Sequence, residues 1–256
     1  MTRTLALVAA GLLCVAIAAR ADEIAVMTSG GFTAPFLEVV PEFERATGHT
    51  VVTAFGASMG NAPDSIPVRL GRGEPADVVI LADSALEELI RQGKVAAGSR
   101  VDLARSTIGM AVRAGAPRPD ISSVEALTRT LLQAKSIAYS ASASGVYLAT
   151  ELFPRLGIAD RISSKSRRIE SERVGAVVAR GEAEIGFQQV SELLGIAGID
   201  YVGPLPPEVQ KVTVFSAGLG AGARAPAAAK ALIAFLASPA MVSVIRKSGL
   251  EPAASR

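Results

Sequence analysis

The sequence predicts an α/β fold with two lobes, each a mostly parallel sheet flanked by helices. Short β-branched or apolar runs alternate along the chain with segments whose apolar residues recur at helical spacing, as in parallel sheets covered by helices. Two strand-like runs, residues 107–113 and 211–215, interrupt this alternation and lead into segments that contain Pro or Gly. We interpret them as strands that cross between the lobes, which assigns residues 22–106 and 216–256 to lobe 1 and residues 107–215 to lobe 2.

The N-terminus has the pattern of a cleavable signal peptide. Arg3 precedes an apolar run over residues 5–19, and small residues at a cleavage site follow it. The run is shorter than the roughly 20 residues that span a membrane, so we expect residues 1–21 to be removed on export. The only cysteine, Cys14, would leave with this segment, and the mature chain would contain no disulfide.

Predicted strands and helices alternate along the rest of the chain. Apolar or β-branched runs predict strands at residues 24–27, 51–55, 78–81, 108–112, 137–139, 185–187 and 212–215. Helical spacing predicts helices that end at Gly48, Gly93 and near Arg180, a helix over residues 124–132, and two C-terminal helices separated at Pro239. Helices thus follow many of the strands, which is the basis of the α/β assignment.

Composition excludes several classes of protein. The 26 basic and 24 acidic side chains nearly balance, and removal of the signal peptide would leave a neutral chain, so no nucleic-acid partner is expected. A single His and a single Cys leave no ligand set for a zinc or iron centre and no His-dependent triad. We therefore expect no cofactor and no metal.

Three strand-to-helix turns are rich in small residues: residues 28–31, 56–60 and 140–145. Glycine allows close approach of the backbone, serine offers a hydroxyl, and a helix start adds partial positive charge. This combination suits a bound anion. Each turn by itself is also typical of ordinary helix capping. Their recurrence after three strands favours a shared anion site.

Two further segments could face the same ligand. Ser171 opens a predicted helix, and the nearby Arg168 and Arg173 could either pair with surface acids or clamp a carboxylate. Gln188 and Gln189 end a strand, where alternation predicts that only one of them contacts the ligand. No acid–base pair, nucleophile or metal cluster is recognisable, so we expect that the chain is not an enzyme.

Several short motifs occur in order along the mature chain. They are FERATG at residues 43–48, FGAS at 55–58, GEPADV at 73–78, AD at 82–83, SGVY at 144–147, GEAEIG at 181–186 and FLASP at 235–239. Their order and spacing resemble the molybdate-binding family of periplasmic solute-binding proteins, which serve ABC importers. The resemblance implies two α/β lobes joined by two crossing strands, with a tetrahedral oxyanion bound in the cleft between them.

The resemblance also implies which positions contact the ligand, but this sequence keeps only some of the family's residues at those positions. The family's serine in the first turn falls on Gly31, beside Ser29, and its tyrosine donor falls on Gln189. Losing two hydroxyls weakens a site for a compact oxyanion and leaves room for a larger ligand such as an organic carboxylate. Residues 61–65, beside the second turn, are extra relative to the family. The predicted ligand-binding residues are Ser29, Gly30, Gly31, Ala57, Ser58, Met59, Ser144, Gly145, Val146, Ser171, Arg173 and Gln189.

We therefore expect a monomeric periplasmic protein that captures a small anion and delivers it to a membrane ABC permease. The anion is either a molybdate-like oxyanion or a small organic carboxylate. Two other functions remain open on this scaffold: a sensor that presents its closed form to a membrane receptor, and a secreted enzyme, which would need catalytic groups that the sequence does not reveal.

Overall fold

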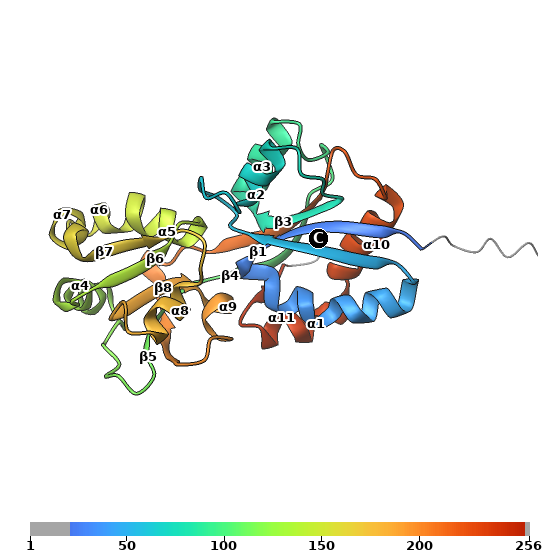
Figure 1. Ribbon diagram of the computed structural model, residues 1–256. Coiled ribbons are helices and arrows are strands. Elements are labelled where there is room, and N and C mark those ends of the chain that lie inside the picture. The colour runs from blue at the N-terminus through green and yellow to red at the C-terminus, as the bar shows by residue number, and fades with distance from the viewer. Residues whose placement is uncertain (1–20, 254–256) are drawn as a thin grey trace, which may run out of the picture.

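The computed structural model describes residues 21–253 and arranges them in two lobes, each built on its own sheet (Figure 1). The two-lobed α/β fold expected from the sequence is confirmed. Of the expected signal peptide, residues 1–20 lie outside the described residues.

Lobe 1 is formed by the two ends of the chain. Its elements are β1 (Glu23–Ser29), α1 (Gly30–Thr47), β2 (Thr50–Gly56), α2 (Ile66–Gly71), β3 (Val78–Ala82), α3 (Asp83–Arg91), β4 (Val101–Ser106), β10 (Thr213–Leu219), α10 (Pro226–Leu236), η4 (Pro239–Met241), α11 (Val242–Lys247) and β11 (Glu251–Pro252). Their strands form a six-stranded sheet in the order β11-β4-β10-β3-β1-β2.

Lobe 2 is formed by the middle of the chain. Its elements are β5 (Ile108–Arg113), α4 (Val124–Gln133), β6 (Ile137–Ser140), α5 (Ala143–Tyr147), η1 (Leu148–Leu152), α6 (Phe153–Arg155), α7 (Ala159–Ile162), η2 (Ser163–Lys165), β7 (Ser166–Ile169), α8 (Val174–Ala179), β8 (Ile185–Gln189), α9 (Val190–Leu193), β9 (Ile199–Pro204) and η3 (Pro207–Val209). Their strands form a five-stranded sheet in the order β7-β6-β8-β5-β9.

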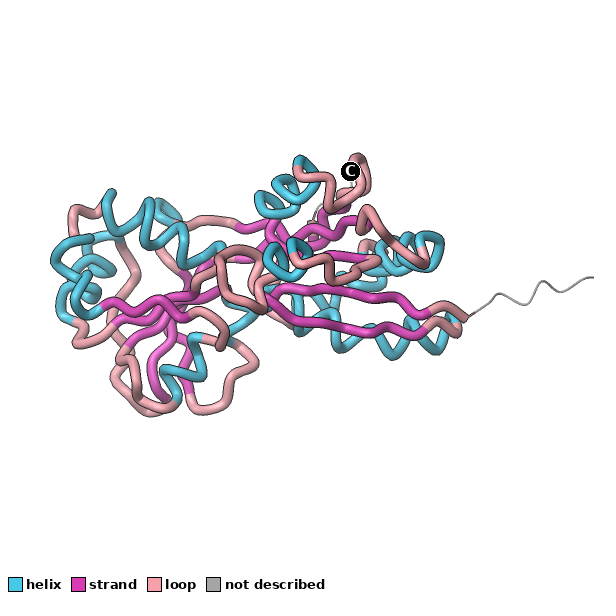
Figure 2. The backbone as a smooth tube through the Cα atoms, turned by 45° about the horizontal axis from the view of Figure 1, so that its top comes forward, coloured by secondary structure: helices cyan, strands magenta, loops and turns pink. Residues whose placement is uncertain are grey.

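Helices cover both faces of each sheet (Figure 2). In lobe 1, α1, α10 and α11 pack on one face, and α2 and α3 pack on the other. The apolar stripe of α1 explains its position, because Phe32, Phe36 and Phe43 recur at helical spacing and are all buried in the core. The helix ends at Gly48, whose φ of 74° lies in the left-handed region that glycine adopts without strain.

Each sheet is mixed rather than mostly parallel. β1 is parallel to β2 and β3, and β6 is parallel to β7 and β8, whereas β5 and β10 run antiparallel to both of their neighbours. The cause is the connection between the lobes: the chain leaves through β4, enters lobe 2 through β5 after Thr107, and returns through β10. The boundary expected after Phe215 falls inside β10, which pairs with β4 from Thr213 onward.

Within residues 21–253, no single helix has both the length and the apolar character to cross a membrane. One pair, α10 with Pro239–Lys247, meets that criterion by length and composition but is bent by 51°.

Candidate functional site

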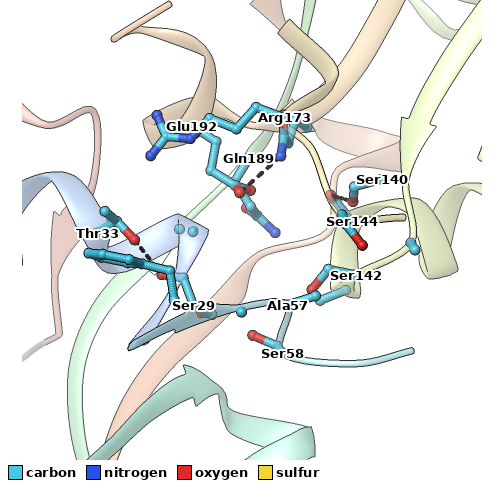
Figure 3. Close-up of a pocket in the computed structure, with 18 of the residues that line it drawn as sticks. Ser29, Thr33, Ala57, Ser58, Ser140, Ser142, Ser144, Arg173, Gln189 and Glu192 are labelled. Atoms are coloured by element: carbon cyan, nitrogen blue, oxygen red, sulfur yellow. Dashed lines mark hydrogen bonds between the residues drawn. The ribbon is translucent and has the colours of Figure 1, made fainter. Parts of the chain in front are cut away.

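A cavity of about 390 Å³ lies between the lobes, where β1, β2, β6, β7 and β8 end (Figure 3). Ligand sites of α/β sheets commonly form at this end of the strands. Lobe 1 lines the cavity with Ser29, Gly30, Gly31, Thr33, Leu37, Phe55, Gly56, Ala57, Ser58, Asp64 and Phe215, and lobe 2 with residues 140–144 and 169–173, Gln188, Gln189 and Glu192. Small-molecule sites span about 300–1,000 Å³, and a tetrahedral oxyanion would leave much of this cavity empty.

The first turn is built around two glycines at the start of α1. A Cβ on Gly31 would lie 2.0 Å from the ring of Phe215, and a Cβ on Gly30 would lie 2.0 Å from Glu192 Oε1. The room that Gly31 leaves is therefore filled by Phe215 rather than by a larger ligand. Beside them, the buried Ser29 hydroxyl has no hydrogen-bond partner among the described residues. Such a group is expected to bond a ligand or water.

The second turn presents Ser58, which is 1% exposed. Its Oγ accepts the backbone N–H of Ala82 at 3.0 Å, so the hydroxyl proton is left to donate elsewhere. The extra residues beside this turn bring Asp64 to the edge of the cavity. There Asp64 Oδ1 accepts a hydrogen bond of 3.0 Å from the Ser171 hydroxyl, which joins the two lobes.

The third turn, after β6, holds its serines in contact with each other. The hydroxyls of Ser140 and Ser144 lie 3.0 Å apart, and both residues are buried. Gly145 does not line the cavity: a Cβ there would lie 1.6 Å from the carbonyl oxygen of Ser140, so this glycine is required by backbone packing. The lining of this turn is thus serine and alanine, without a charged side chain.

Arg173 is the arginine that lines the cavity, where it precedes α8. Within the described residues it forms no ion pair, whereas Arg168 bonds Glu170 at 2.7 Å and points elsewhere. In Figure 3, Arg173 and Glu192 lie on one side of the pocket, opposite Ser29, Ala57 and Ser58. The sequence left open which arginine faces the ligand, and the structure favours Arg173.

Both glutamines line the cavity, whereas strand alternation predicted that only one of them contacts the ligand. Gln188 lies on the strand and connects two elements: its Oε1 accepts the N–H of Val174, and its Nε2 donates to Glu192 Oε1, both at 2.9 Å. Gln189 lies where the strand turns into α9; its Nε2 donates to Thr213 Oγ1, and its buried Oε1 has no partner among the described residues. The bend in the backbone lets neighbouring side chains reach the same cavity.

Sequence reasoning missed Glu192. Its carboxyl group is enclosed between α9 and the start of α1, and this burial raises its pKa from 4.5 to about 7. Arg173 and the hydrogen bond from Gln188 act in the opposite direction but do not cancel the effect. In the sequence, a Glu in the first turn of a helix is typical of favourable interaction with the helix dipole, so nothing marked it as functional.

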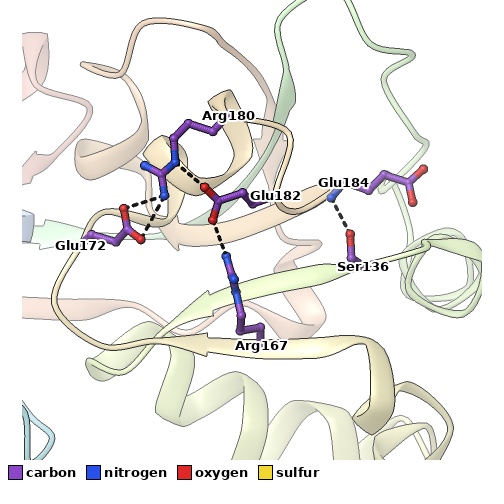
Figure 4. Close-up of polar contacts among 6 residues, drawn as sticks. All are labelled: Ser136, Arg167, Glu172, Arg180, Glu182 and Glu184. Atoms are coloured by element: carbon purple, nitrogen blue, oxygen red, sulfur yellow. Dashed lines mark hydrogen bonds and ion pairs between the residues drawn. The ribbon is translucent and has the colours of Figure 1, made fainter.

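Glu172, which lines the cavity, belongs to a network of ion pairs. Arg180 bonds both Glu172 and Glu182, and Arg167 bonds Glu182 as well (Figure 4). The guanidiniums of Arg180 and Arg167 lower the pKa of Glu182 to about 2. This network anchors the segment that leads to Arg173.

Of the predicted ligand-binding residues, most line the cavity and Met59, Gly145 and Val146 do not. Met59 packs against the core of lobe 1, and Val146, 37% exposed, projects from α5. Among residues 21–253, no group of three or more His, Cys, Asp or Glu side chains could hold a metal ion.

Comparison with known proteins gives the following relatives. A family model described as bacterial extracellular solute-binding protein matches residues 24–251. An aconitate isomerase of a Pseudomonas species is 50% identical over 229 residues, which cover 90% of this chain and 87% of that protein. The molybdate-binding protein ModA of Azotobacter vinelandii is 30% identical over 97% of both chains. The solved periplasmic molybdate-binding protein of A. vinelandii aligns with a TM-score of 0.72 at 23% identity, covering 91% of this chain and 100% of that one.

These relatives confirm the resemblance to molybdate-binding proteins and correct one expectation. The expectation that the chain is not an enzyme is wrong, because a relative that shares half of its residues is named as an isomerase.

Proposed function

Because the chain belongs to the family of bacterial extracellular solute-binding proteins, we propose that it uses their interlobe cleft to bind aconitate and to interconvert its cis and trans isomers. The proposal combines the scaffold of the family with the activity named for the isomerase relative. It also includes a periplasmic location, which the pattern of residues 1–21 supports.

The observation that carries the proposal is the mixed chemistry of the cavity wall. Leu37, Phe55 and Phe215 line it together with hydroxyl and guanidinium donors. An organic acid has a carbon skeleton that such side chains can contact, whereas a tetrahedral oxyanion has none. The wall is therefore better suited to a carboxylic acid than to molybdate.

The donors are also distributed as a multiply charged carboxylic acid requires. Ser29 and Ser58 lie on the lobe 1 wall, Ser144 lies in the turn after β6, and Arg173 precedes α8. Separate groups of donors can each receive one carboxylate, and Arg173 can bond one of them in a bidentate manner. Aconitate carries three carboxylates on a short unsaturated chain, which matches this arrangement.

The test is to incubate the purified protein with either isomer of aconitate and follow both by proton NMR. We expect both starting isomers to reach the same mixture, because an isomerase changes the rate and leaves the equilibrium unaltered. Failure to convert either isomer would contradict the proposal. Calorimetry with tricarballylate, the saturated analogue, measures binding separately from turnover, and molybdate and tungstate serve as comparison ligands.

A second candidate function is capture of the same anion for uptake by an ABC permease. The relatedness to molybdate-binding proteins favours it. Binding of tricarballylate and of both aconitate isomers without conversion would support this function over the first. Reconstitution with the permease in vesicles would then measure delivery directly.

A further inference from the structure

We propose that Glu192 is the acid–base group that moves a proton between the CH₂ carbon and the CH carbon of bound aconitate, and that Gln188 positions its carboxyl group. The inference rests on the proposed isomerase function. Three observations carry it. Glu192 lies between the lobes, it accepts a hydrogen bond from Gln188, and the other acids that line the cavity are bonded to arginine or serine side chains.

The first support is position. Glu192 belongs to lobe 2, yet its Oε1 occupies the space that a side chain on Gly30 of lobe 1 would fill. The neighbouring Ser191 hydroxyl donates to the carbonyl oxygen of Gly31 at 2.8 Å and fixes α9 against the start of α1. The carboxyl group is therefore held at the junction of the two walls, where a ligand that touches both must pass close to it.

The second support is orientation. Because Gln188 Oε1 accepts the N–H of Val174, its amide NH₂ must point toward Glu192 Oε1. That oxygen already accepts a hydrogen bond, so a proton on the carboxyl group is favoured on Oε2. The chain from Val174 through Gln188 thus sets which oxygen exchanges the proton.

The third support is availability in both protonation states. Burial places the pKa of Glu192 at about 7, so the carboxylate and the acid are both populated near neutral pH. Among the described residues, Arg173 is the charged group that acts on it, and Gln188 and the backbone of Gln189 add hydrogen bonds. A group that must take a proton and return it works best when its pKa is near the working pH.

The other acids that line the cavity are already engaged. Glu170 bonds Arg168 at 2.7 Å, Glu172 bonds Arg180 at 3.0 Å, and Asp64 accepts from Ser171. Each of these three carboxyl groups is held by an arginine or serine side chain of the protein itself. Glu192 is therefore the lining acid best suited to exchange a proton with carbon.

The step balances without a cofactor or a second reactant. The Glu192 carboxylate removes a proton from the CH₂ carbon of aconitate, and the C–H electron pair forms a double bond to the central carbon. The original double bond gives its pair to the far carbon, where charge is delocalised onto the attached carboxylate. Protonated Glu192 then delivers the proton to that carbon, and the new double bond can have either geometry. Arg173 and the serine hydroxyls would stabilise the added charge.

The decisive variant is Glu192→Gln, which keeps the shape and removes the proton transfer. We expect isomerisation to fall by about 10²–10⁴-fold, the usual contribution of a general acid–base group, with tricarballylate affinity kept within about threefold. Glu125→Gln is the matched control, because Glu125 is also a first-turn glutamate but is exposed on α4, away from the cavity.

Gly30→Ala provides a variant in which Glu192 is retained but displaced. The added methyl group would lie where Glu192 Oε1 lies, so we expect isomerisation to fall although the carboxyl group is still present. Gly71→Ala is its control, since a Cβ on Gly71 meets no atom within 4 Å. Aconitate deuterated at its CH₂ group reports the step itself: each turnover should leave one deuterium on the carbon that carried two.

The outcomes separate the two proposals. A wild-type protein that leaves both isomers unchanged contradicts the isomerase function. A wild-type protein that isomerises aconitate while Glu192→Gln does so within tenfold overturns the role of Glu192. Loss of tricarballylate binding in Glu192→Gln also overturns it, because the residue would then act in binding. Retention of both deuterium atoms at the original carbon rules out the proton shift.

Discussion

The two walls of the cavity differ in charge. Lobe 1 offers hydroxyls, backbone N–H groups and apolar side chains, and among the described residues Asp64 is the charged one on this wall. Lobe 2 contributes a set of ionisable side chains: Glu170, Glu172, Arg173 and Glu192. Under the proposed mechanism, lobe 1 shapes and orients the ligand, while lobe 2 supplies Arg173 to attract its carboxylates and Glu192 to exchange a proton.

The largest effect expected on ligand binding is that of Arg173→Gln on the lobe 2 wall. A charge-assisted hydrogen bond contributes about 1.5–3 kcal/mol, so tricarballylate affinity should fall by roughly 10–100-fold in calorimetry. Arg168→Gln removes an equal charge from a residue that does not itself line the cavity, and should leave affinity within about twofold. Equal losses in the two variants would mean that net charge, and not the Arg173 contact, attracts the ligand.

The second effect concerns stability and is specific to Glu192. Between pH 4.5 and about 7 the folded protein holds a proton on Glu192 that the unfolded chain has released, so this group makes stability fall as pH rises. Glu192→Gln lacks that ionisation. Relative to wild type it should therefore gain about 1–3 kcal/mol of unfolding free energy between pH 4.5 and 8, measured by urea unfolding. If the difference in unfolding free energy between the variant and wild type did not change with pH, a raised pKa of Glu192 would be contradicted.

Two serines of the lobe 1 wall should behave differently from each other. Ser58→Ala leaves the N–H of Ala82 without its acceptor, so it should cost about 1–2 kcal/mol of stability even without ligand. The Ser29 hydroxyl has no partner among residues 21–253, so Ser29→Ala should leave the unliganded melting temperature unchanged and weaken tricarballylate binding. Thermal unfolding with and without tricarballylate separates the two. A similar loss of unliganded stability in both variants would show that Ser29 is bonded within the protein.

The two walls also differ in how much of each could be predicted from the sequence. The small-residue turns of lobe 1 follow hydrophobic strands such as residues 24–27, and local pattern is enough to place them. Strand β7 was missed because its sequence, SRRI, exposes two arginines at an edge of the sheet. Strands β4 and β9 were missed because polar residues interrupt their apolar ones.

The environment of the ionisable side chains on the lobe 2 wall depends on contacts between segments that are far apart in the sequence. A local sequence pattern does not contain such contacts. Glu192 acquires its environment from Gly30, which is 162 positions earlier in the chain, and Gly31 is a glycine because the ring of Phe215 packs on it. Neither relation has a signature in the neighbouring residues. A raised pKa is likewise a property of the folded environment rather than of the residue type.

The smallest expected effect tests how the two walls are brought together. The hydrogen bond from Ser171 to Asp64 joins the lobes near the cavity edge, so it would break if the lobes moved apart. Removing it lowers the closed population, and the apparent affinity falls in proportion to that population. We expect Asp64→Ala to weaken tricarballylate binding by about 2–10-fold, since a hydrogen bond of this kind contributes about 0.5–1.5 kcal/mol. If Ser171 acts only through Asp64, the double variant with Ser171→Ala should bind as weakly as Asp64→Ala and no more weakly. Additive losses would instead place the Ser171 hydroxyl on the ligand itself.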